Sequence, residues 1–314
     1  MDEQESQTRG LDSRTRKTPF IHKMDKSAAG VVCPSYYVLS HANGCPYRCD
    51  YCCLQLPLKN VQQPVAFDNR EQMLTEVKGF LKRGRARLLS AGESSDSLAL
   101  DHLTGLSSEL VPLFARQDEG LLFPKERPHK LLLVTKSTNI ERLLAIEEKE
   151  NTIVSFSLNA PEISARFEHG APHPYERLKA ARTCKDAGYE IRLRVDPILP
   201  VKNWAVYYLP LVERINADFS DYPLRITLGT IRHNPGLRDC AEARGRNASV
   251  FDFATSQDGS DGRFRLPQDQ RIEIYSWFRD RLGAGVNIAL CKETKETWQH
   301  VGLPCAIPQC NCAL

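Results

Sequence analysis

The sequence lacks the features that would place the protein in a membrane or outside the cell. No apolar run is long enough to cross a membrane, and the first thirty residues are polar and charged, without the apolar core of a signal peptide. The net charge is only +3 over 314 residues, which by itself does not indicate nucleic-acid binding. Cysteine, by contrast, is abundant, with 11 residues. Because cysteines without a secretory signal more often bind metals or act in catalysis than form disulfides, we expect a cytoplasmic location and no membrane partner.

The order of apolar and polar segments predicts an α/β protein. Short apolar strands alternate with helical patterns, which implies parallel pairing and right-handed crossovers, and six or seven such units make an open or partial (β/α)6-type barrel. We expect a polar N-terminal tail at 1–30, disordered or wrapped against the barrel, then the barrel at 31–285. A last strand and a cysteine-rich extension occupy 286–314. The predicted strands are Tyr36–Ser40, Arg87–Ala91, Lys130–Thr135, Thr152–Leu158, Glu190–Val195, Arg225–Thr230 and Val286–Leu290.

Polar or ligand-type residues follow every predicted strand. In barrels of parallel strands the chemistry gathers at the carboxyl ends of the strands, so these residues are expected to face one polar site. After the first strand comes a loop with three cysteines. The later strand ends carry Gly92-Glu93, Lys136, Ser157 with Asn159, Asp196, Arg232 and Cys291.

The three cysteines Cys45, Cys49 and Cys52 have the spacing C-x3-C-x2-C. A cubane 4Fe-4S cluster usually takes four cysteines, so three ligands leave one iron with an open coordination position. A zinc site is the alternative, but structural zinc sites usually have a second cysteine pair, and none follows within thirty residues. The spacing therefore favours an iron–sulfur cluster with an open iron.

This spacing resembles the signature of the radical S-adenosylmethionine (SAM) superfamily. The resemblance implies that the open iron binds SAM and that an electron from the cluster cleaves it to a 5′-deoxyadenosyl radical. It also implies a flavodoxin- or ferredoxin-type reductant as partner. Gly92-Glu93 resembles the superfamily's Gly-Glu motif, whose carboxylate receives the methionyl amino group. Lys136 could meet the methionyl carboxylate, and Ser157 and Asn159 could reach the ribose hydroxyls. Ser95 and Arg194 are the other residues that we expect to contact the cofactor.

Several stretches, in matching order over residues 35–300, resemble spore photoproduct lyase and its relatives. They include Cys-Asp-Tyr-Cys-Cys-Leu-Gln (49–55), Asp-Ser-Leu-Ala-Leu-Asp-His-Leu-Thr-Gly (96–105), Val-Thr-Lys-Ser (134–137) and Phe-Glu-His-Gly-Ala-Pro (167–172). The resemblance implies a radical reaction on a thymine dimer in DNA, with the product radical quenched by a cysteine and two tyrosines.

The sequence departs from that family at the hydrogen-donating residues. Glu93 stands at the position of the family's donor cysteine, and Cys53 stands at one of the two tyrosine positions. The other tyrosine is kept as Tyr51. Cys53 could act as the donor, or it could be a small residue without a catalytic role. Thymine-dimer repair is therefore not carried over by resemblance alone.

The C-terminal segment contains an unusual group of cysteines, namely Cys291, Cys305, Cys310 and Cys312. Irregular spacing favours a second iron–sulfur cluster, while a zinc site and spare thiols remain alternatives.

Three functions are compatible with these patterns. The first is a radical SAM enzyme that acts on a nucleoside, a nucleotide or nucleic acid, where Arg192 and Arg194 share one face of a strand and could bind a phosphate. The second is sulfur insertion into a nucleotide, with the second, C-terminal iron–sulfur cluster as the sulfur source. The third is a non-catalytic metal-binding module that recognises nucleic acid.

Overall fold

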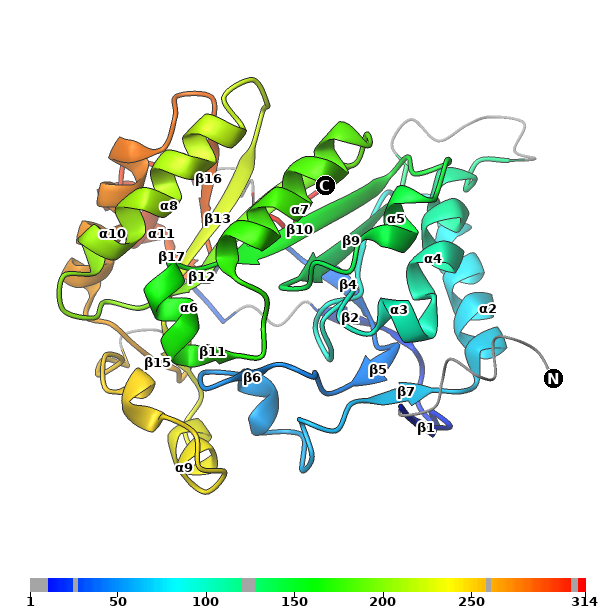
Figure 1. Ribbon diagram of the computed structural model, residues 1–314, viewed down its shortest axis with the longest axis horizontal. Helices are drawn as coiled ribbons and strands as arrows, with labels where there is room; N and C mark the ends of the chain where they lie inside the picture. Colours follow the sequence, from blue (N-terminus) through cyan, green and yellow to red (C-terminus); the bar gives the residue numbers. More distant parts are fainter. Residues whose placement is uncertain (1–10, 25–27, 120–127, 258–260, 306–309) are drawn as a thin grey trace.

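The computed structural model of the protein describes residues 11–24, 28–119, 128–257, 261–305 and 310–314. Its centre is an eight-stranded sheet with the order β16-β13-β12-β10-β9-β8-β4-β2 (Figure 1). From β4 to β16 all neighbouring strands are parallel, and their spatial order follows the chain. The strands of this sheet are β2 (Ile21–Met24), β4 (Tyr36–Leu39), β8 (Leu88–Ser90), β9 (Lys130–Thr135), β10 (Thr152–Leu158), β12 (Glu190–Ile198), β13 (Arg225–Thr230) and β16 (Asn287–Leu290).

The seven predicted strands are confirmed, three of them with the predicted bounds. The α/β fold is therefore confirmed as well. Strand β2 lies in the predicted N-terminal tail and pairs antiparallel with β4, so this part of the tail wraps against the sheet. Residues 1–10 and 25–27 of the predicted tail lie outside the described residues.

Smaller strands join loops at the carboxyl ends of the large sheet. In Figure 1, β5, β6, β7 and β11 lie together below the large sheet. Strand β6 pairs with β11, and β7 pairs with both β1 and β5. The small strands are β1 (Asp12–Arg14), β3 (Val31–Val32), β5 (Ala42–Asn43), β6 (Arg48–Cys49), β7 (Val65–Phe67), β11 (Glu168–His169), β14 (Arg232–His233), β15 (Phe264–Arg265) and β17 (Glu293–Thr294).

Helices follow most of the parallel strands and cover one face of the sheet (Figure 1). The α-helices are α2 (Arg70–Leu81), α3 (Asp101–Thr104), α4 (Leu106–Ala115), α5 (Glu141–Leu144), α6 (Pro161–Phe167), α7 (Pro174–Asp186), α8 (Trp204–Asp218), α9 (Leu237–Glu242), α10 (Gln268–Arg281) and α11 (Lys295–His300). Two short 3-10 helices are η1 (Cys53–Gln55) and η2 (Ala248–Phe251). No helix in the described ranges is long and apolar enough to span a membrane.

The two faces of the sheet bury different side chains. Successive residues of a strand point to opposite faces of the sheet. The face that carries Val154, Phe156 and Leu193 packs against the helices and forms the main apolar core. On the opposite face, the described residues form only a small apolar cluster, which includes Val38 and Leu132. The rest of this second face is polar, and it provides the surface on which a site can form.

Candidate active site

The loop with the three cysteines is held in one backbone conformation. Gly44 has a φ of +85°, and a Cβ at this position would stand 2.7 Å from the carbonyl oxygen of Val61, so only glycine fits before Cys45. The amide of Cys45 donates to the same carbonyl at 2.9 Å. Cys49 lies in β6, whose pairing with β11 places it opposite Glu168. The amide of Cys52 donates to the carbonyl of Cys49 at 3.2 Å, so each cysteine is fixed by a different backbone contact.

The thiols of Cys45, Cys49 and Cys52 are close enough to affect one another. Burial raises the pKa of Cys49 to about 12, and the charges of Glu168 and Cys52 contribute to this rise. Burial also raises the pKa of Cys45, with contributions from Asp96 and from the other two thiols. Within the described residues no three His, Cys, Asp or Glu side chains are arranged around a single metal ion. A cubane cluster does not need such an arrangement, because its irons are separate atoms and each takes its own cysteine; that the three thiols hold one stays a prediction.

The loop that carries Glu93 is joined directly to the loop that carries the cysteines. The amide of Gly44 donates to the carbonyl of Ser94 at 3.0 Å, and the Ser94 hydroxyl donates to the carbonyl of Ala42 at 2.8 Å. Glu93 accepts a hydrogen bond of 3.0 Å from the hydroxyl of Tyr36 on β4. A cofactor that bridges the cysteine loop and Glu93 would therefore contact two segments with a fixed relative position.

Asp96 organises this second loop, a role that the sequence pattern did not reveal. Its Oδ1 accepts from the amides of Leu98 and Ala99 and from the hydroxyl of Thr135, all within 2.9 Å. Its Oδ2 accepts from the amide of Lys136 at 2.7 Å. A single partly buried carboxylate therefore ties the loop after β8 to the end of β9.

Gly92 and Ser95 have roles within this loop. A Cβ at Gly92 would stand 2.6 Å from the Cβ of Val134, so glycine allows the loop to lie directly against β9. Ser95 is buried, and its hydroxyl donates to the carbonyl of Asp96 at 3.4 Å. The structure thus shows a local structural contact for each of these two predicted cofactor-binding residues.

Lys136 and Tyr51 meet at Glu168, beside the cysteine loop. The Tyr51 hydroxyl donates to Glu168 Oε1, and the Lys136 ammonium lies 4.0 Å from the same oxygen. The ammonium also lies 5.6 Å from the centre of the Tyr51 ring. Arg177, which is fully buried, pairs with Glu168 Oε2 at 2.6 Å. Burial alone would raise the pKa of Glu168, but the charges of Lys136 and Arg177 outweigh this effect and lower that pKa to about 2.

Asn159 is a structural residue, which differs from the prediction that it binds a ribose. Its Nδ2 donates to Glu168 and to the carbonyl of Pro197, both at 3.2 Å. Its Oδ1 accepts from the Tyr208 hydroxyl at 2.6 Å and from the amide of Ala160 at 3.0 Å. Because the side chain is fully buried and its donors and acceptors are all used, none remains for a ligand.

Ser157 lies nearby on the polar face of β10. The residue is buried, and its carbonyl accepts from Arg177 at 3.1 Å. That its hydroxyl binds a ribose remains a prediction.

The C-terminal residues 310–314, which we call the tail, lie against the polar face of the large sheet. Figure 1 places the C-terminus at the middle of this sheet, beside β10. Arg192 donates to the carbonyls of Asn311 and Ala313 in the tail and pairs with Glu190 at 2.6 Å. These contacts differ from the prediction that Arg192 binds a phosphate, because the guanidinium is committed to the protein.

The tail brings three of the four C-terminal cysteines together. Arg194 donates to the sulfur of Cys312 at 3.3 Å, and Arg232 donates to the sulfur of Cys291 at 3.0 Å. Cys310 forms a hydrogen bond with the side chain of Cys312, which together with Arg194 lowers the pKa of Cys312 to about 6. Cys305 packs against the apolar core and has no hydrogen-bond partner within the described residues. Residues 306–309 lie outside those residues.

Glu93 connects the tail to the cysteine loop. Its charge acts on Cys53, on Arg194 and on Cys312. Cys53 follows the third cluster cysteine and is exposed, and the charge of Arg232 also acts on it. The candidate donor Cys53 and the C-terminal Cys312 are therefore both close enough to the predicted SAM-binding carboxylate to be affected by its charge.

The connection between α9 and η2 fastens the cysteine loop. Arg244 donates to the carbonyls of Gln55, Leu58 and Lys59, and Arg246 donates to the carbonyl of Arg48 at 2.7 Å. The segment acts as a clamp on the loop in this structure.

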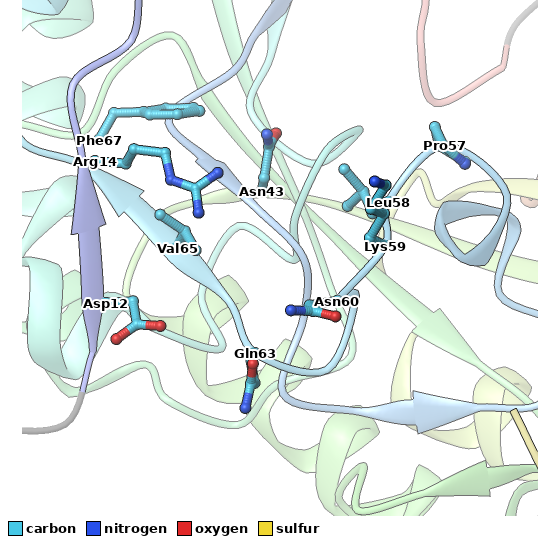
Figure 2. Close-up of a pocket in the computed structure, with 10 residues that line it drawn as sticks. All are labelled: Asp12, Arg14, Asn43, Pro57, Leu58, Lys59, Asn60, Gln63, Val65 and Phe67. Atoms are coloured by element: carbon cyan, nitrogen blue, oxygen red, sulfur yellow. The ribbon is translucent and has the colours of Figure 1, made fainter.

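A surface pocket of about 340 Å³ lies beside the cysteine loop but contains none of the predicted site residues. Figure 2 shows its side chains, which come from β1, β5, β7 and the connecting loop at 57–63. The residues that line it are Asp12, Arg14, Asn43, Pro57, Leu58, Lys59, Asn60, Gln63, Val65 and Phe67.

Comparison with known proteins identifies the family. The family model of spore photoproduct lyase matches residues 21–236, which is more than half of the chain. The chain belongs to the spore photoproduct lyase family. The Bacillus subtilis (strain 168) spore photoproduct lyase is 28% identical over 200 residues, which cover 63% of this chain and 56% of that protein. The Clostridium acetobutylicum spore photoproduct lyase is 21% identical over 270 residues, or 82% of this chain and 76% of that protein. The chain thus spans little more than half the length of the Bacillus relative.

Solved structures of spore photoproduct lyase share the fold. A cysteine-to-alanine variant with dinucleoside spore photoproduct has a TM-score of 0.74 and 20% identity, and the match covers 90% of this chain and 82% of that one. A double variant with bound AdoMet and the same dinucleoside has a TM-score of 0.74 and 21% identity, with coverage of 92% and 85%. These similarities show that the α/β architecture of this chain is that of spore photoproduct lyase.

Proposed function

We propose that this protein is a radical SAM enzyme of the lyase type that acts on a dinucleotide lesion in DNA. The cluster would be held by Cys45, Cys49 and Cys52. The observation that carries the proposal is the direct hydrogen bonding between the cysteine loop and the loop of Glu93, because it holds the candidate cluster ligands and the candidate SAM-binding carboxylate on adjoining segments. Membership in the spore photoproduct lyase family and the lesion named in the related structures support the substrate. We infer that the large sheet corresponds to the partial barrel of radical SAM enzymes.

The bound cluster and SAM would supply a 5′-deoxyadenosyl radical, and the chain would bind and orient them. Tyr36 directs the Glu93 carboxylate, which can accept hydrogen bonds from an ammonium group. Lys136 places a positive charge beside Cys49 and Glu168, where it would balance the negative charges of the Cys49 thiolate and the Glu168 carboxylate. We therefore assign Lys136 to the cluster environment, in place of the SAM carboxylate that the sequence suggested.

The direct test is anaerobic turnover of reconstituted protein with SAM, a reductant and dinucleoside spore photoproduct. We expect 5′-deoxyadenosine and repaired dinucleoside from the wild type, and neither from Cys49→Ala. As a matched control, Cys184→Ala removes a buried thiol of α7 that is remote from the loop in sequence, and it should retain both products. Formation of 5′-deoxyadenosine without repair would support the radical SAM class and reject the lesion as substrate.

Sulfur insertion with a second, C-terminal cluster is the other candidate. The observation that favours it is the grouping of Cys291, Cys310 and Cys312 on the polar face. It would also explain why no donor cysteine is needed at Glu93. Iron content separates the two candidates, because one 4Fe-4S cluster gives about four irons per chain and two clusters give about eight.

A further inference from the structure

The pocket in Figure 2 is built on one face of the three-stranded sheet β1-β7-β5. In the register of this sheet Asp12 lies opposite Val65 on one side, and Asn43 lies opposite Val65 on the other. Two residues further along β1, Arg14 lies opposite Phe67. Paired residues of neighbouring strands point to the same face of a sheet, and so do alternate residues of one strand. These five side chains therefore line one pocket, with two charges and an amide around an apolar floor.

The loop at 57–63 forms the opposite wall of the pocket, across from β1 in Figure 2. The amide of Gln63 donates to the carbonyl of Asn60 at 3.1 Å, which closes a turn within this loop. Arg244 donates to the carbonyl of Lys59 at 3.2 Å. The side chains of Lys59, Asn60 and Gln63, which all line the pocket, are thus presented by a backbone that is held by hydrogen bonds.

The pocket adjoins the loop of the candidate cluster ligands. The carbonyl of Val61, in the wall at 57–63, accepts from the amide of Cys45 at 2.9 Å. Asn43, on the floor of the pocket, stands two positions before Cys45 in the chain. A ligand in the pocket would therefore lie beside the segment that carries Cys45.

The polar side chains of the pocket are not engaged by the protein. Within the described part of the chain, none of the six polar residues that line the pocket forms a hydrogen bond or an ion pair through its side chain. Arg14 and Lys59 are exposed, whereas Arg192 and Arg244 donate to carbonyls of the protein. Two cations without an internal partner can bind an external anion without breaking a contact of the fold.

This set of side chains has the chemistry that a nucleotide requires. Arg14 and Lys59 can donate to the oxygens of a phosphate. The three side-chain amides both donate and accept, which matches the mixed donors and acceptors of a base edge, and the apolar floor can contact the face of a base. The volume of about 340 Å³ lies near the lower end of the range of about 300–1,000 Å³ for small-ligand sites, so the pocket fits one monomer unit. A protein partner would instead need a contact area of about 800 Å².

The charges are separated along the pocket. In Figure 2 Arg14 lies at the end with Phe67, and Asp12 lies towards the end with Gln63. The guanidinium of Arg16 lies 5.0 Å from the centre of the Phe67 ring and adds a second positive charge at the first end. This arrangement favours a phosphate at the end with Arg14. It favours a base amino group, from which a carboxylate can accept, at Asp12.

We propose that this pocket binds a nucleotide next to the lesion in a single DNA strand. The proposal rests on the proposed function, because that function makes a lesion in DNA the substrate. The lesion is covalently joined to nucleotides on both sides, so the strand has to leave the site across the surrounding surface. The pocket is part of this surface and adjoins the segment of Cys45. It holds the flanking strand and takes no part in the radical reaction itself.

The test compares two substrates of the reconstituted protein, dinucleoside spore photoproduct and a single-stranded hexanucleotide with the same lesion at its centre. Only the hexanucleotide has flanking nucleotides, so we expect the wild type to have the lower KM for it. Arg14→Gln and Lys59→Gln should each raise this KM about tenfold, the typical effect of losing one hydrogen bond to a charged group. Both variants should keep the wild-type kcat and the wild-type KM for the dinucleoside. Lys179→Gln, which removes an exposed cation of α7, is the matched control and should behave as the wild type with both substrates.

Strand binding provides a second readout that does not depend on turnover. Fluorescence anisotropy with an undamaged, labelled hexanucleotide should give a Kd about tenfold higher for Arg14→Gln than for the wild type and for Lys179→Gln. The slope of log Kd against log salt concentration should fall by about 0.7, because one phosphate contact to a single strand is lost. Equal KM values of the wild type for the two substrates, or an unchanged Kd in both Arg14→Gln and Lys59→Gln, would overturn the proposal.

Two further outcomes separate this proposal from its alternatives. Slower formation of 5′-deoxyadenosine by Arg14→Gln with a flavodoxin-type reductant, but not with dithionite, would overturn the proposal in favour of a docking site for the reductant. Absence of 5′-deoxyadenosine from the wild type would refute the proposed function itself. Binding of the undamaged hexanucleotide would in that case still decide whether the pocket holds a DNA strand.

Discussion

Replacement of Glu168 by glutamine should destabilise the protein more than any surface charge removal, because it leaves two buried cations without their carboxylate. Glu168 is 2% exposed and accepts hydrogen bonds from Tyr51, Asn159 and Ser164. It also pairs with Arg177 at 2.6 Å. Glutamine keeps the size of the side chain but removes the charge, so the change tests electrostatics with little change in volume.

The expected loss follows from the pKa of Glu168. A pKa that falls from 4.5 in the unfolded chain to about 2 in the folded protein corresponds, at about 1.4 kcal/mol per pKa unit, to about 3 kcal/mol of stability. Removal of one partner of a buried ion pair typically costs about 3–5 kcal/mol of stability, which agrees with the value from the pKa. Because the folded pKa is the lower one, this stability is complete above about pH 4.5 and is lost as the pH falls towards 2.

Urea denaturation of the apoprotein at pH 7.5, followed by circular dichroism, measures the effect. Glu148→Gln is the matched control, because that carboxylate pairs with Arg116 at the surface and should leave the free energy of unfolding unchanged. A loss of less than about 1 kcal/mol in Glu168→Gln would refute the assignment of Glu168 as the counter-charge of two buried cations. The variant should also retain less iron after reconstitution, since Glu168 lies opposite Cys49 in the β6–β11 pair.

Three further predictions concern the surroundings of the site. Burial lowers the pKa of His41 from 6.5 to about 4, so the free energy of unfolding should fall by about 1.4 kcal/mol per pH unit as the pH falls between these two values. His41→Gln should remove this slope in urea denaturation, and an unchanged slope would contradict the prediction. Gly92→Ala places a Cβ 2.6 Å from a side chain of β9 and should lower the free energy of unfolding by about 1–3 kcal/mol, as measured by thermal denaturation. Gly84→Ala, where the added Cβ meets open space, should leave this free energy unchanged, and equal stabilities of the two variants would reject the close approach at Gly92. Arg244→Gln removes hydrogen bonds to three carbonyls of the cysteine loop and should therefore increase cleavage of that loop in limited proteolysis. Arg238→Gln, at the surface, is the control, and equal cleavage of the loop in both variants would contradict the clamp.

The sequence predicted the architecture well because the relevant signals are local and repeated. Alternating apolar strands and helical segments fix parallel pairing, and the strand at Thr152–Leu158 was predicted with its observed bounds. Because the carboxyl ends of parallel strands meet at one edge of a sheet, the sequence predicted that Glu93 and the cysteine loop lie close together, and the structure shows hydrogen bonds between their loops. These features depend on patterns along the chain, which a single sequence shows.

Roles that depend on tertiary contacts were harder to predict. Asn159 follows a strand, as a ligand-binding residue would, but its partners come from three other segments, and only the fold shows that they use its whole amide. Glu168 lies in no recognised cofactor motif, although the Phe-Glu-His-Gly stretch supported the family resemblance. The position of Asn311 depends on three strands that are far away in sequence. The wrapping of β2 rests on a four-residue strand that is too short for a clear periodicity.

The measurement that tests the central claim most directly is 5′-deoxyadenosine formation by anaerobically reconstituted protein with SAM and a strong reductant. We predict that the wild type forms 5′-deoxyadenosine and that the Cys45→Ala, Cys49→Ala and Cys52→Ala variants do not. A wild type that holds about four irons per chain but leaves SAM intact would contradict the radical SAM assignment and favour a non-catalytic metal-binding module.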